Sequence, residues 1–184
     1  MRYDGAMRSD ADADKIRRFL AALGQRCRTE GVVYLTGGAT ALLLGWRDST
    51  VDIDLKLDPE PDGAFEAIAR LKDELDVNVE LASPDAFLPE LRDWRERSLV
   101  EGRFGKVRVL HYDLRAQALA KIARGHARDL TDVDAMIERD LVTRAELAAA
   151  FAEMRPRLVR YPRLDAERFA ARVARVTGAA ANDD

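Results

Sequence analysis

Hydrophobic and polar residues alternate without a break from Val51 to Leu57. A period of two is typical of a β-strand, because successive side chains point to opposite faces of a sheet. The apolar positions, which we expect to face a core, are Val51, Ile53, Leu55 and Leu57. Asp52, Asp54 and Lys56 then share the other face. This stretch therefore predicts a strand that presents two carboxylates together.

The stretch before this strand predicts a shorter strand, a glycine turn and a short helix. Residues 32–35 form an apolar run suited to a buried strand. Gly37 and Gly38 interrupt the pattern after Thr36, and residues 39–44 are typical of a helix. Glycines let the backbone approach a phosphate closely, and the first turn of a helix offers free N–H groups. The turn is therefore a candidate phosphate-binding site beside the two carboxylates.

Further elements around this stretch complete a small sheet. They are helices over residues 14–30 and 63–75, a strand over 76–81, and a hairpin of strands 99–104 and 106–112. Asp12 or Asp14 is placed to cap the first helix, and Gly105 marks the turn of the hairpin. We expect the hairpin to extend the sheet.

From residue 113 onward the pattern is helical. The expected elements are a helix ending at Gly125, one capped by Asp129, one capped by Thr143, and a last helix over 164–176. Thr143 and Glu146 have the spacing of a capping box. The sequence thus predicts an α+β fold. A small mixed sheet flanked by helices would occupy residues 1–112, a helical region packed on it residues 113–178, and a disordered tail residues 179–184.

Composition narrows the class of protein. The chain has 184 residues, of which 47% are hydrophobic and 34% charged, and a net charge of −3, which is typical of a soluble globular protein. No apolar run approaches the roughly 20 residues that cross a membrane, and the first 14 residues lack the apolar core of a signal peptide. We therefore expect a cytoplasmic protein with no membrane partner.

Cysteine and histidine are too scarce for disulfide or zinc chemistry. Cys27 is the single cysteine, which excludes an intrachain disulfide. Its position on a helical stripe predicts a buried hydrophobe rather than a nucleophile. The two histidines, His111 and His126, lie far apart in the sequence and have no cysteine partners for a zinc site.

Positive charge gathers near the C-terminus. Between Arg155 and Arg175 there are seven Arg residues against Asp165 and Glu167. Such an excess suits an RNA or another acidic surface. The reading that we favour from the sequence is a solvated face of an arginine-rich surface helix. The sequence leaves both readings open.

The acidic strand suggests metal chemistry. Asp52 and Asp54 would stand about 6–7 Å apart along one face, which lets a divalent cation such as Mg²⁺ or Mn²⁺ bind between them. Each part alone is common, because half-exposed strands alternate in this way and Gly-Gly is an ordinary turn. The glycine turn and the acidic strand together, in this order, favour a functional site.

The order Gly37-Gly38 and then Asp52-Ile53-Asp54 in a hydrophobic strand resembles the signature of the polymerase-beta-type nucleotidyltransferase superfamily. The fuller strings GGATAL at 37–42 and RDST at 47–50 resemble its small bacterial, AbiEii-like toxin members. The resemblance implies that Asp52 and Asp54 bind the catalytic metal. It also implies that a nucleoside triphosphate is held by Gly37, Gly38, Arg47 and Thr50.

The superfamily completes its metal site with a third carboxylate on an adjacent strand. Glu80 is the better candidate for this role, and Asp76 at the entry of the same predicted strand is the second. The alternative is that Glu80 is a surface residue of an edge strand.

A second motif lies around the Gly125 turn. Lys121-x-x-Arg124, followed by Arg128-Asp129-x-x-Asp132, resembles the C-terminal motif of the same AbiEii-like families. The resemblance implies that Lys121, with Arg124 beside it, contacts the triphosphate, and that Asp129 and Asp132 orient basic residues or support catalysis. The alternative is that both acids cap a helix while Lys121 extends along an apolar face.

Together with these residues, the resemblance implies an Mg²⁺-dependent nucleotidyltransferase that would transfer a nucleoside monophosphate to an acceptor hydroxyl. The resemblance suggests a toxin–antitoxin or phage-defence role, with tRNA or a protein as acceptor and a possible cognate antitoxin. Two alternatives remain: an enzyme that modifies a small molecule such as an antibiotic, and an inactive member that acts as a binding partner. The sequence departs from the family pattern in two places. Gly38 replaces the commoner Ser, and Arg47 and Thr50 stand one residue further apart than usual.

Overall fold

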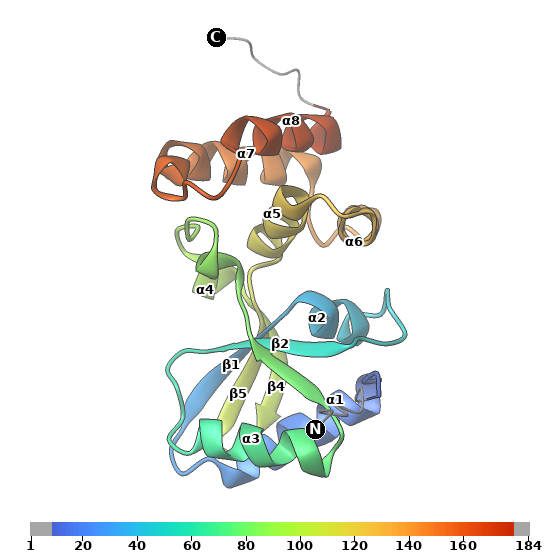
Figure 1. Ribbon diagram of the computed structural model, residues 1–184, viewed down its shortest axis with the longest axis vertical. Coiled ribbons are helices and arrows are strands. Elements are labelled where there is room, and N and C mark those ends of the chain that lie inside the picture. Colours follow the sequence, from blue (N-terminus) through green and yellow to red (C-terminus); the bar gives the residue numbers. More distant parts are fainter. Residues whose placement is uncertain (1–8, 179–184) are drawn as a thin grey trace, which may run out of the picture. The chain divides into compact units, whose positions relative to one another are not determined.

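The computed structural model describes residues 9–178, and these divide into two compact units (Figure 1). The first comprises residues 9–82 and 100–111, and the second comprises residues 83–99 and 112–178. Residues 83–99, which the sequence analysis grouped with the first region, therefore contact the C-terminal helices more than the sheet. The predicted tail over 179–184 lies outside the described residues.

The first unit is built on a five-stranded mixed sheet with the order β3-β2-β1-β5-β4. The strands are β1 (Gly31–Thr36), β2 (Asp52–Leu57), β3 (Asn78–Leu81), β4 (Leu99–Phe104) and β5 (Val107–His111). β1 pairs antiparallel with β2 and parallel with β5, while β2 pairs parallel with β3. The predicted α+β class and the mixed sheet are confirmed, and the predicted hairpin extends the sheet as expected.

Three helices contribute to one hydrophobic core with the sheet. They are α1 (Ala13–Arg26), α2 (Gly37–Leu43) and α3 (Ala64–Glu74). The core side chains of the central strands, such as Val33, Leu35 and Leu55, are fully buried. Because strand residues alternate between faces, the residues between them lie on the opposite face of the sheet. That opposite face carries the acidic residues of β2.

The first helix begins and ends for identifiable reasons. Asp12 caps α1 by accepting a hydrogen bond from the Lys15 N–H, as one of the two predicted caps. The predicted extension to residue 30 is wrong, because the chain turns away after Arg26. The carbonyl of Gly24 accepts a hydrogen bond from the backbone N–H of Lys106, and the backbone N–H of Arg28 donates to the Asp62 carbonyl. Neither group is therefore available to a continuing helix.

The second unit is helical. Its elements are η1 (Pro84–Ala86), α4 (Trp94–Arg97), α5 (Leu114–Arg124), α6 (Ala127–Glu138), α7 (Arg144–Met154), η2 (Arg155–Arg160) and α8 (Ala166–Thr177). α5 contacts α6, α7 and α8, so it is the central helix of the unit. Aromatic pairs join distant segments: Trp94 stacks on Tyr112 with ring centroids 4.1 Å apart, and Phe151 meets Phe169 edge-on at 4.9 Å. None of the helices in the described part of the chain is long and apolar enough to cross a membrane.

Two predicted helix starts in this unit had different outcomes. The capping box at Thr143 is confirmed, since Thr143 and Glu146 exchange both hydrogen bonds at the start of α7. The cap predicted at Asp129 is wrong. α6 begins earlier, with His126 at the N-cap position, and Asp129 lies in its first turn. The carboxylate of Asp129 is instead bound by Arg124, at 2.9 Å and 3.0 Å.

Candidate functional site

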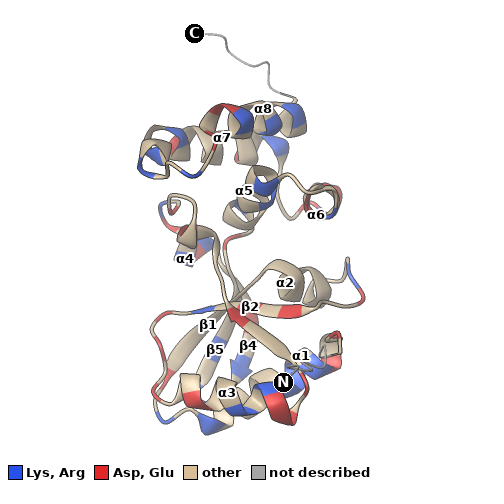
Figure 2. Cartoon of the chain, in the orientation of Figure 1, with Lys and Arg blue, Asp and Glu red and all other residues tan. Residues whose placement is uncertain are grey.

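The acidic face of β2 has the predicted arrangement. Ile53 and Leu55 are fully buried on the core face, whereas Asp52 and Asp54 are half-buried on the opposite face. Figure 2 shows acidic positions on this strand. Val51 is the exception to the predicted alternation, because it precedes the strand and is 47% exposed. The strand therefore presents the two carboxylates on the same side of the sheet.

A third carboxylate lies beside this pair. In the parallel ladder between β2 and β3, Asp54 is paired with Glu80 and Asp52 with Asn78. Directly paired residues in a ladder point to the same face. The carboxylates of Asp52 and Glu80 form no hydrogen bond or ion pair with any residue in the described range 9–178. They are therefore available to a ligand.

Asp76, the second candidate for the third carboxylate, has other partners. Its backbone has a φ of +51°, so β3 begins only at Asn78 rather than at the predicted residue 76. The Asp76 carboxylate accepts from the Ser9 hydroxyl at 2.7 Å and lies 3.8 Å from the Lys15 ammonium. Of the two candidates, only Glu80 lies in register with Asp54.

The glycine turn packs directly against the acidic strand. Gly37 has a φ of +58°, which disfavours any residue with a side chain. A Cβ atom built at Gly37 would overlap the Oδ2 atom of Asp54. The backbone of the turn therefore reaches the carboxylate of Asp54 only because residue 37 is a glycine.

The second glycine brings two more predicted residues to the same place. A Cβ atom at Gly38 would overlap the Thr50 hydroxyl and lie 3.6 Å from Nη1 of Arg47. Thr50 is buried, and its hydroxyl donates to the Asp52 carbonyl at 2.9 Å. The first unit therefore gathers five predicted site residues at one end of β2: Gly37, Gly38, Arg47, Thr50 and Asp54.

The second predicted motif forms a buried ionic cluster. The Lys121 ammonium donates to Asp132 at 2.6 Å and to Asp129 at 3.3 Å, and the side chains of Lys121 and Asp132 are 4% and 3% exposed. Arg124 binds Asp129 through two hydrogen bonds. Burial disfavours the charged form of Asp129, but Arg124 and Lys121 more than offset it, so the pKa of Asp129 lies below its ordinary value. The motif thus joins α5 to α6.

The structure places the predicted residues in two groups. The carboxylates, the glycine turn, Arg47 and Thr50 belong to the first unit, whereas Lys121, Arg124 and Asp132 belong to the second. Within the range 9–178, no three His, Cys, Asp or Glu side chains converge closely enough to enclose a metal ion. The roles in nucleotide binding that the resemblance implies for Lys121 and Arg124 stay predictions.

Sequence reasoning missed one polar cluster in the first unit. The ring of His111 is 1% exposed, with Nδ1 3.1 Å from the Thr40 hydroxyl and Nε2 3.1 Å from the Glu101 carboxylate. Burial lowers the pKa of His111, and Glu101 offsets this only in part. Nothing in the local pattern pairs Thr40 with residues about 60 and 70 positions later, because only the parallel pairing of β1 with β5 brings them together.

Cys27 has the inert character expected from the sequence. It is 2% exposed, and burial raises the pKa of its thiol. A protonated, buried thiol is a poor nucleophile. The candidate chemistry of this chain therefore rests on carboxylates and glycines.

One comparison with known proteins gives a match. The chain matches a family model over residues 14–158, and the family is described as a nucleotidyltransferase of unknown function (DUF6036). The match covers well over half of the chain and includes the glycine turn, the acidic strand and the Lys121 cluster. No curated protein and no solved structure matches the chain.

Proposed function

Because the chain belongs to this nucleotidyltransferase family, we propose that it transfers a nucleoside monophosphate from a nucleoside triphosphate to an acceptor hydroxyl, with Mg²⁺ or Mn²⁺ as cofactor. The observation that carries the proposal is the packing of Gly37 against the Asp54 carboxylate. It brings a turn suited to a phosphate next to a carboxylate suited to a metal ion. This chemistry requires both in one place, since the metal must contact the phosphate that is transferred.

The carboxylates fit a magnesium ion that is shared with its substrate. Mg²⁺ is usually bound by one or two carboxylates together with waters and substrate phosphates, so an enclosed three-carboxylate site is not required. Asp52 and Asp54 would supply these ligands, and Glu80 would complete the site from β3. When bound, the ion would neutralise phosphate charge and lower the pKa of the acceptor hydroxyl.

The glycine turn and its neighbours would hold the triphosphate. Gly38 allows the Thr50 hydroxyl and the Arg47 guanidinium to approach the turn. A guanidinium offers several N–H donors in a fixed plane, which suits the oxygens of a phosphate. Thr50 would keep the residues before the acidic strand in place through its bond to the Asp52 carbonyl. These residues therefore orient the substrate, while the carboxylates act at the reacting phosphate.

More specifically, we propose that the protein belongs to the AbiEii-like branch of the superfamily. The strings at residues 37–42 and 47–50 support it, together with the Lys121 motif. On this proposal the protein is a cytoplasmic toxin or phage-defence component, and its acceptor is tRNA or a protein side chain. A cognate antitoxin would then be its natural partner.

The proposal is tested by incubating the full chain with each nucleoside triphosphate labelled at the α-phosphate. Total cellular RNA and protein serve as acceptors, with Mg²⁺, Mn²⁺ or EDTA in parallel. We expect label to move to one macromolecule with a metal ion present and not with EDTA. Asp54→Asn should abolish the transfer, because it removes a metal ligand at nearly constant volume. Glu60→Gln is the matched control, since Glu60 is exposed and has no partner in the described range.

Each outcome of this assay separates the alternatives. Transfer by Asp54→Asn at the wild-type rate would refute the proposed mechanism. Label that appears only on an added small molecule would favour the antibiotic-modifying alternative. Binding of nucleotide without transfer to any acceptor would favour an inactive binding protein.

A further inference from the structure

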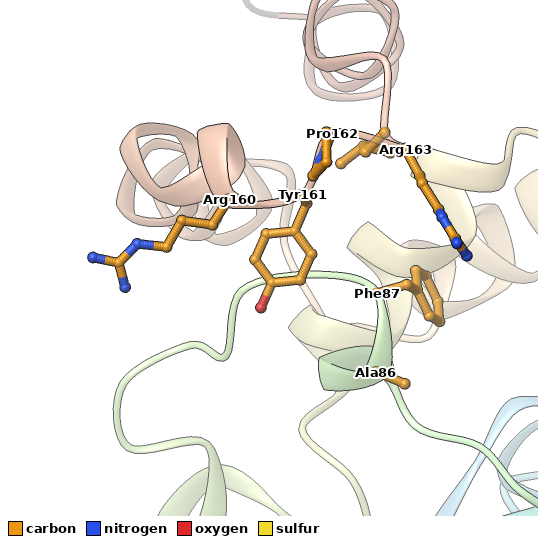
Figure 3. A pocket seen from close by; sticks show the side chains of 7 residues that line it. Ala86, Phe87, Arg160, Tyr161, Pro162 and Arg163 are labelled. Atoms are coloured by element: carbon orange, nitrogen blue, oxygen red, sulfur yellow. The ribbon is translucent and has the colours of Figure 1, made fainter.

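The second unit contains a cavity that no motif in the sequence indicates. Its volume is about 380 Å³, and it lies between Phe87, which follows η1, and residues 160–164, which run from the last residue of η2 toward α8 (Figure 3). Cavities of about 300–1,000 Å³ are typical of ligand sites. Every residue that lines it belongs to the second unit. The cavity is therefore a feature of that unit alone.

Two aromatic rings line the cavity. Tyr161 is partly exposed, and Phe87 is 38% exposed although a phenylalanine ring is normally buried. Figure 3 shows the ring of Tyr161 extending from the 160–164 segment toward the loop that carries Phe87. Exposed aromatic faces are the surfaces on which proteins stack unpaired bases. The walls of the cavity thus suit a planar ring.

Two arginines border the same cavity. Arg160 and Arg163 form no hydrogen bond or ion pair through their side chains with any residue in the described part of the chain. Both are exposed. Residues 155–164 contain four Arg and no Asp or Glu, in a protein whose net charge is −3. Figure 2 shows the basic residues of this segment and of α8. The charge is therefore a local property of this segment.

Acidic side chains lie on one side of the cavity only. A neighbouring cavity of about 320 Å³ shares Arg160 and Tyr161 with the first and is also lined by Asp85 and Glu90. No residue that lines the first cavity is acidic. An anionic group would therefore avoid the side of Asp85 and Glu90 and lie near Arg163.

We propose that this cavity binds one nucleotide of a single-stranded nucleic acid. The base stacks on Tyr161 and Phe87, and an adjacent phosphate contacts Arg163. The strand is single because a base within a duplex is stacked on its neighbours and cannot enter a pocket. The inference deepens the proposed function by selecting a polynucleotide as the acceptor. In this one step, the identity of the acceptor, it rests on the proposed function. The binding itself requires neither triphosphate nor metal.

The number of charges favours a polynucleotide over a free nucleotide. One nucleotide needs one or two cations. The segment from residue 155 to residue 163 has four arginines, separated by one or two other residues. Arg157 already donates to the Glu90 carbonyl and lies 3.3 Å from Glu153, so it is the least available of the four. The remaining three are spaced along an exposed segment, which suits successive phosphates.

The test measures binding of the full chain to a fluorescent oligonucleotide of about 12 nucleotides. RNA and DNA of one sequence are compared by fluorescence anisotropy in EDTA, without nucleoside triphosphate, over a series of salt concentrations. Tyr161→Ala should weaken binding about 10-fold or more with an unchanged salt dependence, because it removes stacking. Arg163→Gln should weaken binding and reduce the slope of log K against log salt by about 0.7, because it removes one phosphate contact. Thermal unfolding verifies that each variant is folded.

Arg18→Gln is the matched control. Arg18 is an exposed arginine on α1 with no partner in residues 9–178, so the variant should bind as the wild type does. Equal binding of RNA and DNA would indicate recognition of base and phosphate alone, and preference for RNA would add a contact to the 2′-hydroxyl. Absence of binding to both oligonucleotides up to about 100 µM would overturn the inference. Equal effects of Arg18→Gln and Arg163→Gln on binding would also overturn the inference. So would AMP that displaces the fluorescent oligonucleotide as effectively as the unlabelled oligonucleotide does.

The binding test and the transfer assay fail independently. Asp54→Asn should bind the oligonucleotide as the wild type does, because Asp54 belongs to the first unit. Binding without any transfer would refute the proposed function and leave the nucleic-acid site intact. Transfer to protein or to a small molecule without oligonucleotide binding would refute the inference alone.

Discussion

Asp54 on β2 and Glu80 on β3 are direct neighbours in a parallel ladder, so both carboxylates belong to the same face of the sheet. Neighbouring strands are about 4.8 Å apart, which is within the reach of two carboxylates that share one cation. Asp76, two positions before the same strand, is bound by Ser9 and Lys15 instead. The pairing of two strands therefore selects Glu80 as the candidate third carboxylate.

The third carboxylate is tested by a pair of variants. Glu80→Gln should lower kcat of transfer by about 100-fold or more, because it removes a negative charge from the reacting centre. Asp76→Asn should leave kcat within about 2-fold of the wild type and lower stability slightly, because an exposed ion pair contributes little. Steady-state kinetics and urea unfolding measure the two effects. The reverse result would assign the role to Asp76.

The close packing of the glycine turn predicts that alanine at Gly38 and alanine at Gly45 have different effects on activity. Gly38→Ala should lower kcat/KM for the triphosphate by about 10-fold or more, since the new Cβ atom displaces the Thr50 side chain. It should also destabilise the protein by about 1–3 kcal/mol through overpacking. Gly45 serves as the comparison, because it has a φ of +88° but open space around it. Gly45→Ala should cost about 1–2 kcal/mol of backbone strain and keep its activity.

The buried cluster of α5 and α6 predicts a third outcome. Asp132→Ala should lower the free energy of unfolding by about 3–5 kcal/mol, because it leaves the Lys121 ammonium buried with only the longer contact to Asp129. The double variant Lys121→Met/Asp132→Asn should recover most of this loss, since no uncompensated charge remains. Urea unfolding measures both. A loss below about 1 kcal/mol for the single variant would contradict the buried pair.

The same double variant tests the role of Lys121 that the resemblance implies. Once stability is recovered, calorimetric titration with a nucleoside triphosphate reports on binding alone. Weaker binding would support a role of the Lys121–Asp132 pair in holding the triphosphate. Affinity equal to that of the wild type would confine Lys121 to holding α5 against α6.

His111 predicts a dependence of stability on pH. The ring of His111 lies 3.1 Å from the Glu101 carboxylate through Nε2 and 3.1 Å from the Thr40 hydroxyl through Nδ1. The Thr40 hydroxyl itself donates to the Leu35 carbonyl. Burial lowers the pKa of His111 from its ordinary value of about 6.5. Between the lowered pKa and 6.5 the unfolded chain binds more protons than the folded one, so stability rises with pH in this window. The stability that the neutral His111 ring contributes is present above pH 6.5 and is lost as the pH falls through the lowered pKa.

Urea unfolding between pH 5 and pH 8 measures this dependence. His111→Gln should flatten the curve between the lowered pKa and pH 7, since it removes the group that titrates. His126→Gln is the control, because His126 is the other histidine and is exposed. It should keep the wild-type slope. A slope that disappears in His126→Gln and persists in His111→Gln would refute the assignment.

Local features of the fold were predictable because a few adjacent residues determine them. The alternation at residues 52–57 fixed which side of β2 is buried, since a strand has only two faces. The caps at Asp12 and Thr143 depend on a side chain that reaches an N–H group three residues later. Gly37 marked a turn because its backbone conformation excludes most other residues. Each of these signals lies within one turn or strand.

Features that depend on distant segments were harder to predict. The order β3-β2-β1-β5-β4 places Glu80 beside Asp54, and no local pattern indicates which strands pair. Asp129 has the sequence of a helix cap, but Arg124 from the preceding helix binds its carboxylate. Electrostatic attraction to a buried cluster outweighed the local capping preference.

The sequence by itself determined the candidate chemistry of this protein: a glycine turn, then two carboxylates on one face of a strand. Both depend only on the spacing of residues along the chain. The tertiary structure decided which other groups join them. It placed Arg47 and Thr50 at the turn, formed the open cavity beside Tyr161 from segments more than 70 residues apart, and buried Lys121 between two acids. The physical reason is that contacts between distant segments depend on how strands pair and helices pack, which no short stretch of sequence encodes.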